Sequence, residues 1–344
     1  MTSTHSNPSL AHHFATAEDG AQLSYYSIGT GPGIVIVHGA MSYALTHKDL
    51  AVALSPYFTV NIFSRRTRGL SDPFPPSITN PPALPTPQTT PSSQTTMRIA
   101  NRAAPRTYPP SYSSAILQTE VSDLHTILKT TTSHFVISIS SGALITLSYL
   151  LTYSCSPERL ITKAILFEPA VQFFDLPGDK PSSLPAGAGR GIALYEERRA
   201  AGDMVEALVA ALKATGMVPG WVPGWVLRGV MKLRARKGDR DKEGEEDVGV
   251  TDLLKLAEAL RYDFCVGEAM VGDSERCKGL KGVEVLLMGG TESRGYLGEG
   301  MDVLGGLIEG SKRVVVQGLG HGGLGQGGKP ERAVGAIRRF FEGL

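Results

Sequence analysis

The stretch FVISISSGALITL, residues 135–147, places three serines between two apolar runs. Ser138, Ser140 and Ser141 follow a β-branched segment that predicts a buried strand, and the apolar residues after Gly142 predict a helix. A strand, then a small residue, a serine and a glycine spaced two apart, then a helix is typical of a turn that exposes a nucleophilic serine. The stretch therefore predicts serine chemistry, with a tightly packed turn of small residues as the alternative.

Ser140 is the nucleophile that the spacing favours. The turn is so sharp that the residues two before and two after the nucleophile must be small, because a larger side chain would collide with the strand or the helix. With Ser140 at the centre these positions are Ser138 and Gly142. With Ser141 at the centre, one of them would be Ile139.

Apolar runs that predict strands alternate with segments of helical spacing over most of the chain. The pattern predicts a mostly parallel sheet wrapped by helices on both faces, an α/β fold, because buried parallel strands read as continuous apolar runs. A hairpin is expected around Asp19-Gly20. The other expected strands lie in 33–40, 57–64, 134–140, 161–169, 282–290 and 312–320, and the expected helices in 115–130, 141–154 and 331–344.

Two segments depart from this alternation. Residues 73–110 hold half of the 22 prolines and predict a long, mobile surface loop, with a docking segment for a partner as the alternative. Residues 171–282 contain two helix-like stretches, 191–216 and 250–264, and predict an inserted helical cap. The domains expected are thus a core of residues 1–170 and 283–344 and a cap of residues 171–282.

The predicted cap carries two tryptophans and a charged run. Trp221 and Trp225 are predicted to line an apolar substrate pocket, with packing inside the cap or against the core as the alternative. The run within 232–247 mixes both charge signs, which favours a solvated or disordered linker over a nucleic-acid patch.

Composition narrows the classes of partner. The 344 residues include 34 Lys and Arg and 33 Asp and Glu, for a formal net charge of +1. This balance predicts no nucleic-acid partner and no anionic membrane surface. The N-terminus lacks the apolar core of a secretory signal, and the apolar runs are too short to span a membrane. We therefore expect a soluble, cytoplasmic protein, and the sequence leaves its oligomeric state open.

Metal ligands are sparse in the sequence. Cys155, Cys265 and Cys277 are odd in number and widely spaced, so they predict neither a disulfide framework nor a metal site. The pair His12-His13 has no Cys or carboxylate cluster beside it. We expect no metal and no cofactor, since acyl transfer through a serine requires neither.

Four motifs in the same order resemble the α/β-hydrolase superfamily, over most of the chain outside the Pro-rich segment. SISSG resembles its nucleophile turn, and VIVHGA resembles its strand followed by His-Gly and an oxyanion-hole residue. FSRRTRGLSD is similar to the turn after the next strand, with Ser64 where an Asp is common. VVVQGLGH resembles the last strand and the catalytic histidine.

The resemblance implies roles for several residues. His321 would be the general base and acid for Ser140, and the backbone N–H groups of Ala40 and Ser141 would bind the oxyanion. Met41, which follows Ala40, is predicted to contact the substrate. His38 would brace the oxyanion loop.

Two carboxylates compete for the role of the acid that orients His321. Glu292 follows the strand 282–290, where the superfamily commonly has its acid, although Ser293 holds that place under the other count of the two glycines. Glu168 follows the preceding strand, as in lactonases similar to the zearalenone hydrolases, which share a Ser-Ser-Gly turn. We favour Glu168.

The function predicted is hydrolysis of a carboxylic ester or lactone of an apolar small molecule, with a secondary metabolite as the class that the resemblance favours. Two alternatives stay open. The same residues would serve a cyclase, an acyltransferase or a lyase, and a ligand-binding receptor or inactive scaffold of the same fold would retain the site without turnover.

Overall fold

The computed structural model describes residues 9–79, 107–171, 188–218, 221–229 and 253–344. They divide into two compact units, which we call the sheet unit and the helical unit. Of the described residues, the sheet unit comprises 9–73, 119–170 and 275–344, and the helical unit comprises 74–79, 107–118, 171, 188–218, 221–229 and 253–274.

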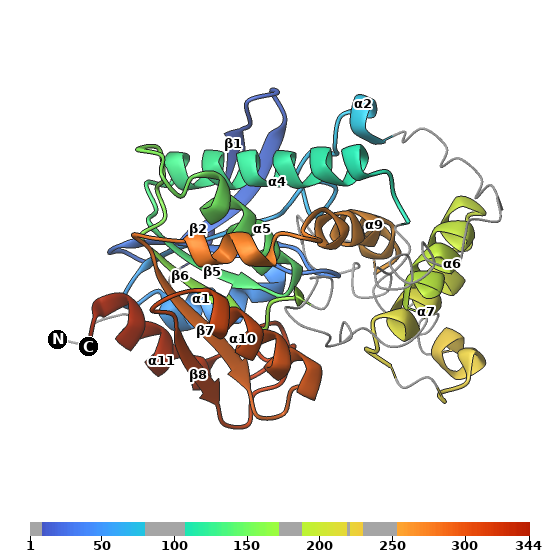
Figure 1. Cartoon of the computed structure of the whole chain (residues 1–344). Helices are drawn as coiled ribbons and strands as arrows, with labels where there is room; N and C mark the ends of the chain where they lie inside the picture. Colours follow the sequence, from blue (N-terminus) through green and yellow to red (C-terminus); the bar gives the residue numbers. More distant parts are fainter. Residues whose placement is uncertain (1–8, 80–106, 172–187, 219–220, 230–252) are drawn as a thin grey trace. The chain divides into compact units, whose positions relative to one another are not determined.

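The sheet unit is built on one eight-stranded sheet (Figure 1). Its strands are β1 (Ala11–Thr16), β2 (Gln22–Ile28), β3 (Gly33–Val37), β4 (Thr59–Phe63), β5 (Phe135–Ile139), β6 (Lys163–Phe167), β7 (Glu284–Gly290) and β8 (Lys312–Val316). Their order across the sheet is β1-β2-β4-β3-β5-β6-β7-β8. The pairs β1–β2 and β2–β4 are antiparallel. The six strands β4, β3, β5, β6, β7 and β8 run parallel, which confirms the predicted mostly parallel sheet.

Alternate residues of the central strands face two apolar layers. Ile34 and Ile36 of β3 belong to a core cluster that helices α1 (Lys48–Leu54) and α11 (Glu331–Glu342) complete with Leu50, Ile337 and their neighbours. The helix α10 (Gly295–Leu307) lies on the other face, where Gly305 approaches Leu287 of β7. Burial on both faces explains why these strands are continuous apolar runs.

The remaining helices of the sheet unit connect its strands. A short 3-10 helix, η1 (Ala44–His47), precedes α1, and α5 (Ser141–Thr152) begins directly after β5. The helix α4 (Pro110–Thr130) precedes β5, and its residues from Thr119 onward belong to the sheet unit. A second 3-10 helix, η4 (Ser274–Gly279), leads into β7.

The helical unit contains α2 (Pro76–Thr79), α6 (Ala188–Ala200), α7 (Met204–Ala214) and α9 (Leu253–Ala269). The sequence predicts one helix over 191–216, but Gly202 takes a φ of +79° and Asp203 caps a new helix by accepting the N–H of Glu206, so two helices form. Part of the predicted loop 73–110 forms the single turn α2, and residues 80–106 lie outside the described residues.

The division differs from the expected one in two places. The described residues 74–79 and 107–118 belong to the helical unit, whereas the prediction assigned them to the core, and they contact helix α9 of that unit. Glu268 accepts the N–H groups of Thr107 (2.7 Å) and Tyr108 (3.1 Å), and the ring of Phe74 contacts that of Tyr262. The chain returns to the sheet unit at Glu275 instead of residue 283.

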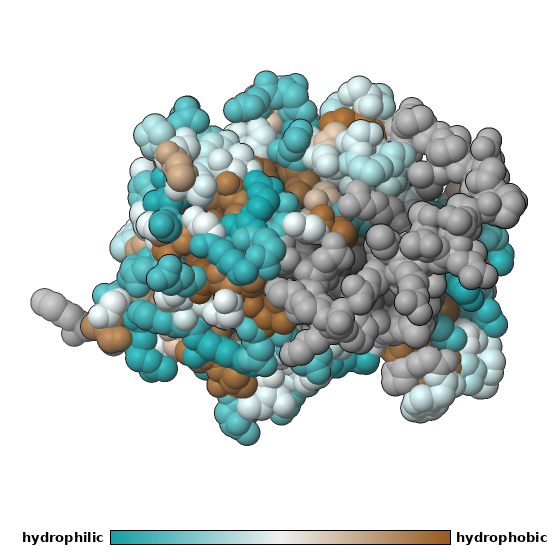
Figure 2. Space-filling model, in the orientation of Figure 1, coloured by the Kyte–Doolittle hydropathy of each residue, from teal (hydrophilic) through white to brown (hydrophobic). Residues whose placement is uncertain are grey.

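The surface seen in Figure 2 mixes hydrophilic residues with small groups of hydrophobic ones. Among the described residues, no helix combines the length and the hydrophobicity needed to cross a membrane.

Candidate active site

Ser140 occupies a strained turn between β5 and α5. Its backbone has φ +54° and ψ −118°, a region that costs a non-glycine residue about 1–3 kcal/mol and that persists only where the surroundings enforce it. The turn is closely packed: a Cβ on Gly142 would lie 2.5 Å from the carbonyl oxygen of Val37, and a Cβ on Gly39 would lie 3.0 Å from the Cβ of Ser140. The small residue predicted at position 142 is therefore required by the packing.

Backbone strain gathers around this turn. The described non-glycine residues with positive φ are Met41 (+55°), Thr67 (+66°), Thr132 (+49°), Ser140 (+54°) and Glu168 (+44°). Met41, Ser140 and Glu168 follow the ends of β3, β5 and β6, which are neighbours in the sheet. Clusters of strained residues of this kind are a feature of functional sites.

His321 and Glu168 form a hydrogen-bonded pair. The ring Nδ1 of His321 lies 2.7 Å from Oε2 of Glu168, whose carboxylate is completely buried, while the His321 side chain is 23% exposed. In the described part of the chain Nδ1 is the only ring nitrogen of His321 that makes a hydrogen bond, so Nε2 is left for another partner. A buried carboxylate on Nδ1 holds an imidazole in the orientation and tautomer that a general base needs.

Three groups hold the buried Glu168 carboxylate in place. Besides His321, the N–H of Gly290 donates to Oε1 at 2.9 Å, and the hydroxyl of Ser293 donates a short hydrogen bond to the same oxygen. The glycines at the end of β7 make room for this contact, because a Cβ on Gly289 would lie 3.3 Å from Oε1. Charge-assisted hydrogen bonds of this kind stabilise a buried anion.

Glu292, the other candidate acid, is exposed. Among the described residues, its side chain makes no hydrogen bond with His321. Its backbone instead joins the loop that carries His321, with its N–H donating to the carbonyl of Leu319 at 2.9 Å. Ser293, which holds the other possible position for an acid after β7, contacts the carboxylate from β6. The structure therefore brings Glu168, and not Glu292, to His321.

Ser140 and His321 are not hydrogen-bonded to each other in the described structure. Ser140 is instead linked to the Glu168 strand: its N–H donates to the carbonyl of Phe167 at 3.0 Å, and its carbonyl accepts from Ala170 at 3.3 Å. Hydrogen bonds between a nucleophile and its base are often long in ligand-free enzymes and tighten when substrate binds.

The backbone N–H groups of Ala40 and Ser141 are the predicted oxyanion donors. Ser141 is the first residue of α5, where the N–H groups carry the partial positive charge of a helix N-terminus. Ala40 follows β3, and its N–H donates to no group within the described residues. Met41 is half-buried beside Ala40. Ala40 and Met41 thus follow β3 and Ser141 follows β5, which are neighbouring strands, and their roles toward the substrate stay predictions.

His38 is sealed between two backbone groups. Its Nε2 lies 3.1 Å from the N–H of Arg65, and its Nδ1 lies 2.8 Å from the carbonyl oxygen of Gly39. Because a backbone N–H can only donate, Nε2 is the acceptor and Nδ1 carries the proton that Gly39 accepts. Burial and the nearby charge of Arg65 hold the pKa of His38 well below its usual range, so the ring is neutral.

The structure leaves the two tryptophans of the helical unit exposed, at 82% for Trp221 and 69% for Trp225. This does not support their packing inside the unit, and a role of either in substrate binding stays a prediction. No cluster of metal-binding side chains occurs among the residues that the structure describes.

Several residues at the site were not identified from the sequence. Gly290 and Ser293 support Glu168, and Arg65 contacts both His38 and the hydroxyl of Ser141. The sequence marked their positions without their contacts: Ser293 as an alternative place for the acid, Arg65 within FSRRTRGLSD, and the Gly-Gly pair at the end of β7, which indicates a close approach to the backbone.

Comparisons with known proteins agree with this architecture. The sequence matches no protein-family model and no curated protein. Among solved structures, an alpha/beta hydrolase from Sphaerobacter thermophilus is similar with a TM-score of 0.65 and 20% identity, covering 96% of this chain and all of that one.

Two esterases show the same similarity. The esterase EaEST from Exiguobacterium antarcticum has a TM-score of 0.61 and 17% identity, covering 96% of this chain and 100% of its own. The esterase RhEst1 from a Rhodococcus species has a TM-score of 0.55 and 16% identity, covering 97% of this chain and 99% of its own. With the strand order described above, these similarities establish that the chain has the α/β-hydrolase fold.

Proposed function

We propose that this protein is a serine hydrolase that cleaves a carboxylic ester or lactone through an acyl-enzyme on Ser140. The observation that carries the proposal is the pair of His321 and a fully buried Glu168, at the same edge of the sheet as the strained turn of Ser140. A buried acid, an imidazole with one unoccupied nitrogen and a serine on a strained turn are the parts that serine-based acyl transfer requires.

In the first half of the reaction, the hydroxyl oxygen of Ser140 attacks the carbonyl carbon of the substrate while Nε2 of His321 takes the hydroxyl proton. Glu168 accepts a hydrogen bond from the Nδ1–H of the resulting imidazolium and stabilises its charge without taking the proton. The N–H groups of Ala40 and Ser141 bind the oxyanion, where each such donor contributes about 100- to 1000-fold in rate. Collapse of this intermediate breaks the ester bond, and His321 returns the proton to the alcohol oxygen.

The second half repeats these steps with water. His321 takes a proton from water, the hydroxide attacks the acyl carbon, and collapse of the second oxyanion releases the carboxylic acid and restores the Ser140 hydroxyl. With a lactone the alcohol stays attached to the acyl group, so a single hydroxy acid leaves the site.

The choice of ester or lactone rests on the nucleophile and on the similar structures. Ser140 gives an acyl-enzyme, and two of the similar proteins are named as esterases. The preference for an apolar substrate rests on the composition of residues 171–282 alone, which include both tryptophans.

A panel of p-nitrophenyl esters with acyl chains of two to twelve carbons, together with unsubstituted lactones of six- to fourteen-membered rings, tests the proposal. We expect kcat/KM to be highest for one of the longer esters or larger rings, and Ser140→Ala to remove turnover while the circular-dichroism spectrum stays unchanged. Turnover that survives in Ser140→Ala would contradict the assigned nucleophile. Folded wild-type protein that hydrolyses no member of the panel would instead favour a receptor or a non-hydrolytic enzyme.

A further inference from the structure

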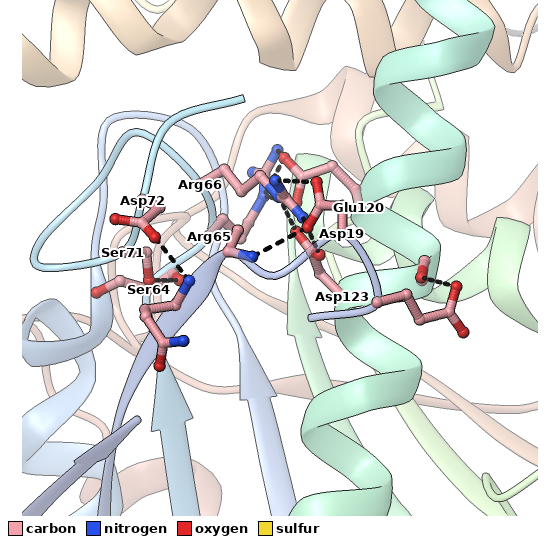
Figure 3. A network of polar contacts seen from close by, with 12 residues as sticks. Asp19, Ser64, Arg65, Arg66, Ser71, Asp72, Glu120 and Asp123 are labelled. Carbon is pink, nitrogen blue, oxygen red and sulfur yellow. Dashed lines mark hydrogen bonds and ion pairs between the residues drawn. The ribbon is translucent and has the colours of Figure 1, made fainter. Parts of the chain in front are cut away.

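The sheet unit contains two consecutive buried arginines that pair with acids on the same helix (Figure 3). Arg65 contacts Glu120 through Nε (3.0 Å) and Nη2 (2.7 Å), and Arg66 contacts Asp123 through Nε (2.7 Å) and Nη2 (2.9 Å). The four side chains are at most 2% exposed. Glu120 and Asp123 are one turn apart on α4, so the two pairs are nearly equivalent in burial and geometry.

The two pairs differ in what else they contact. Arg66 continues to Asp19 in the turn between β1 and β2, with both Nη atoms at 2.8 Å. Arg65 instead contacts the site. Its backbone N–H donates to Nε2 of His38 at 3.1 Å, and its Nη1 lies 3.5 Å both from the hydroxyl of Ser141 and from the carbonyl of His38.

The contact to His38 reaches one oxyanion donor directly. His38 donates from Nδ1 to the carbonyl oxygen of Gly39, and that oxygen belongs to the same peptide group as the N–H of Ala40. A peptide group is planar, and the chain has no cis peptide bond among its described residues, so fixing the carbonyl fixes the direction of the N–H on the opposite side. The contact to Ser141 holds the residue that carries the other donor.

The strand order explains why one arginine reaches both donors. β3 lies between β4 and β5 in the sheet. The residues that follow these three strands, 38–41, 64–66 and 140–141, are therefore neighbours at the carboxyl edge. Arg65 follows β4, His38 follows β3 and Ser141 follows β5. The ion pair with Glu120 fixes Arg65, and Arg65 in turn contacts a residue on each side of the predicted oxyanion site.

We propose that the buried Arg65–Glu120 pair, acting through His38 and Ser141, is a positioning element for the oxyanion hole. This inference rests on the proposed function. Arg65 and Glu120 need not touch the substrate; they set the direction of the Ala40 N–H and the place of Ser141. Arg66 and Asp123 hold the β1–β2 hairpin and have no such role.

A matched pair of double variants tests the proposal. Arg65→Met/Glu120→Met removes one ion pair, and Arg66→Met/Asp123→Leu removes the other; replacing both partners avoids leaving an unpaired buried charge, so both proteins are expected to fold. For the best ester of the panel, we expect the first variant to lose about 10- to 100-fold in kcat, because displaced oxyanion donors lose part of their 100- to 1000-fold contribution. KM should stay within about threefold. The second variant should keep kcat within about threefold.

Two substitutions of His38 test the hydrogen bond from His38 to Gly39 through kcat, independently of their effect on stability. In His38→Asn the side-chain amide can take the place of Nδ1 and still donate to Gly39, whereas in His38→Gln it can take the place of Nε2 and loses that donation. We expect the Asn variant to retain more of kcat than the Gln variant, whichever is more stable.

The outcomes separate the two proposals. Equal losses of kcat in the two double variants, or losses that only follow their melting temperatures, would overturn the positioning role while leaving the nucleophile assignment intact. Should either double variant fail to fold, Glu120→Gln against Asp123→Asn gives the same comparison. If the wild-type protein hydrolyses no ester of the panel, the proposed function is wrong, and the positioning role that rests on it falls with it.

Discussion

His321 and His38 lie in the same unit and have one feature in common: a hydrogen bond on Nδ1 that fixes the ring. They differ at Nε2. His38 is 1% exposed and its Nε2 accepts from the backbone of Arg65, whereas the His321 side chain is 23% exposed and its Nε2 has no partner among the described residues. A ring that moves protons needs one unoccupied nitrogen and an acid behind the other; a ring that holds backbone in place uses both nitrogens.

The largest effect in this comparison is expected from a substitution that removes the hydrogen bond on Nδ1 of His321. Glu168→Gln should lower kcat/KM by about 10³- to 10⁴-fold, because an amide does not stabilise the imidazolium and can select the wrong tautomer. Glu292→Gln is the matched control on an exposed carboxylate and should stay within about threefold of wild type. Steady-state kinetics on one ester measure both, and similar mild effects of the two substitutions would mean that neither is the acid.

A smaller effect is expected from the support of Glu168. Ser293→Ala removes one of the two hydrogen bonds to Oε1 and leaves that from Gly290. We expect kcat to fall about tenfold, since one hydrogen bond to a charged group is worth about 1.5–3 kcal/mol and only part of it is lost in the transition state alone. Ser293→Thr keeps the hydroxyl and should restore most of the rate. An unchanged kcat in Ser293→Ala would show that Gly290 alone is sufficient.

The sequence made the sheet and the sharp turn at Ser140 predictable, and the reason is local. Buried parallel strands appear as continuous apolar runs, and the turn around Ser140 needs small residues at fixed spacing. The helix α10 was not predicted, because its glycines give a weak helical signal. A Cβ built on one of these glycines, Gly305, would lie 3.6 Å from the side chain of Leu287 in the sheet. Close packing of α10 on the sheet therefore offsets the low helix propensity of its glycines.

The contacts between distant segments could not be read from the sequence in the same way. Glu168 and Ser293 are 125 residues apart, and only the sheet order brings them together. The acids of the arginine pairs read as ordinary polar positions of an amphipathic helix, because the same residue types serve on a solvated surface. Resemblance offered two acids, Glu168 and Glu292, and the structure distinguishes them by contact and burial.

The smallest effect concerns the pH dependence of stability that the buried His47 contributes. His47 is also buried: its Nδ1 donates to the carbonyl of Leu324 at 2.9 Å, its Nε2 has no partner among the described residues, and burial lowers its pKa. The unfolded chain therefore takes up the proton first, at a pKa of about 6.5, and stability falls as the pH decreases below that value.

We expect His47→Gln to reduce this dependence by up to about 1.4 kcal/mol per pH unit, measured by urea unfolding at pH 7.5, 6.5 and 5.5. Leu54→Val, a buried change without a titrating group, should retain the wild-type slope. The same slope in wild type and His47→Gln would contradict a neutral, sealed His47.

Covalent labelling tests whether Ser140 is an activated nucleophile. Wild-type protein and Ser140→Ala are each incubated with a fluorophosphonate, and the intact mass and the labelled peptide are determined by mass spectrometry. We expect a single adduct on the peptide that contains residues 135–147 in the wild type, much slower labelling in Glu168→Gln, and none in Ser140→Ala. Folded wild-type protein that gains no mass, or a label that persists in Ser140→Ala, would contradict this role of Ser140.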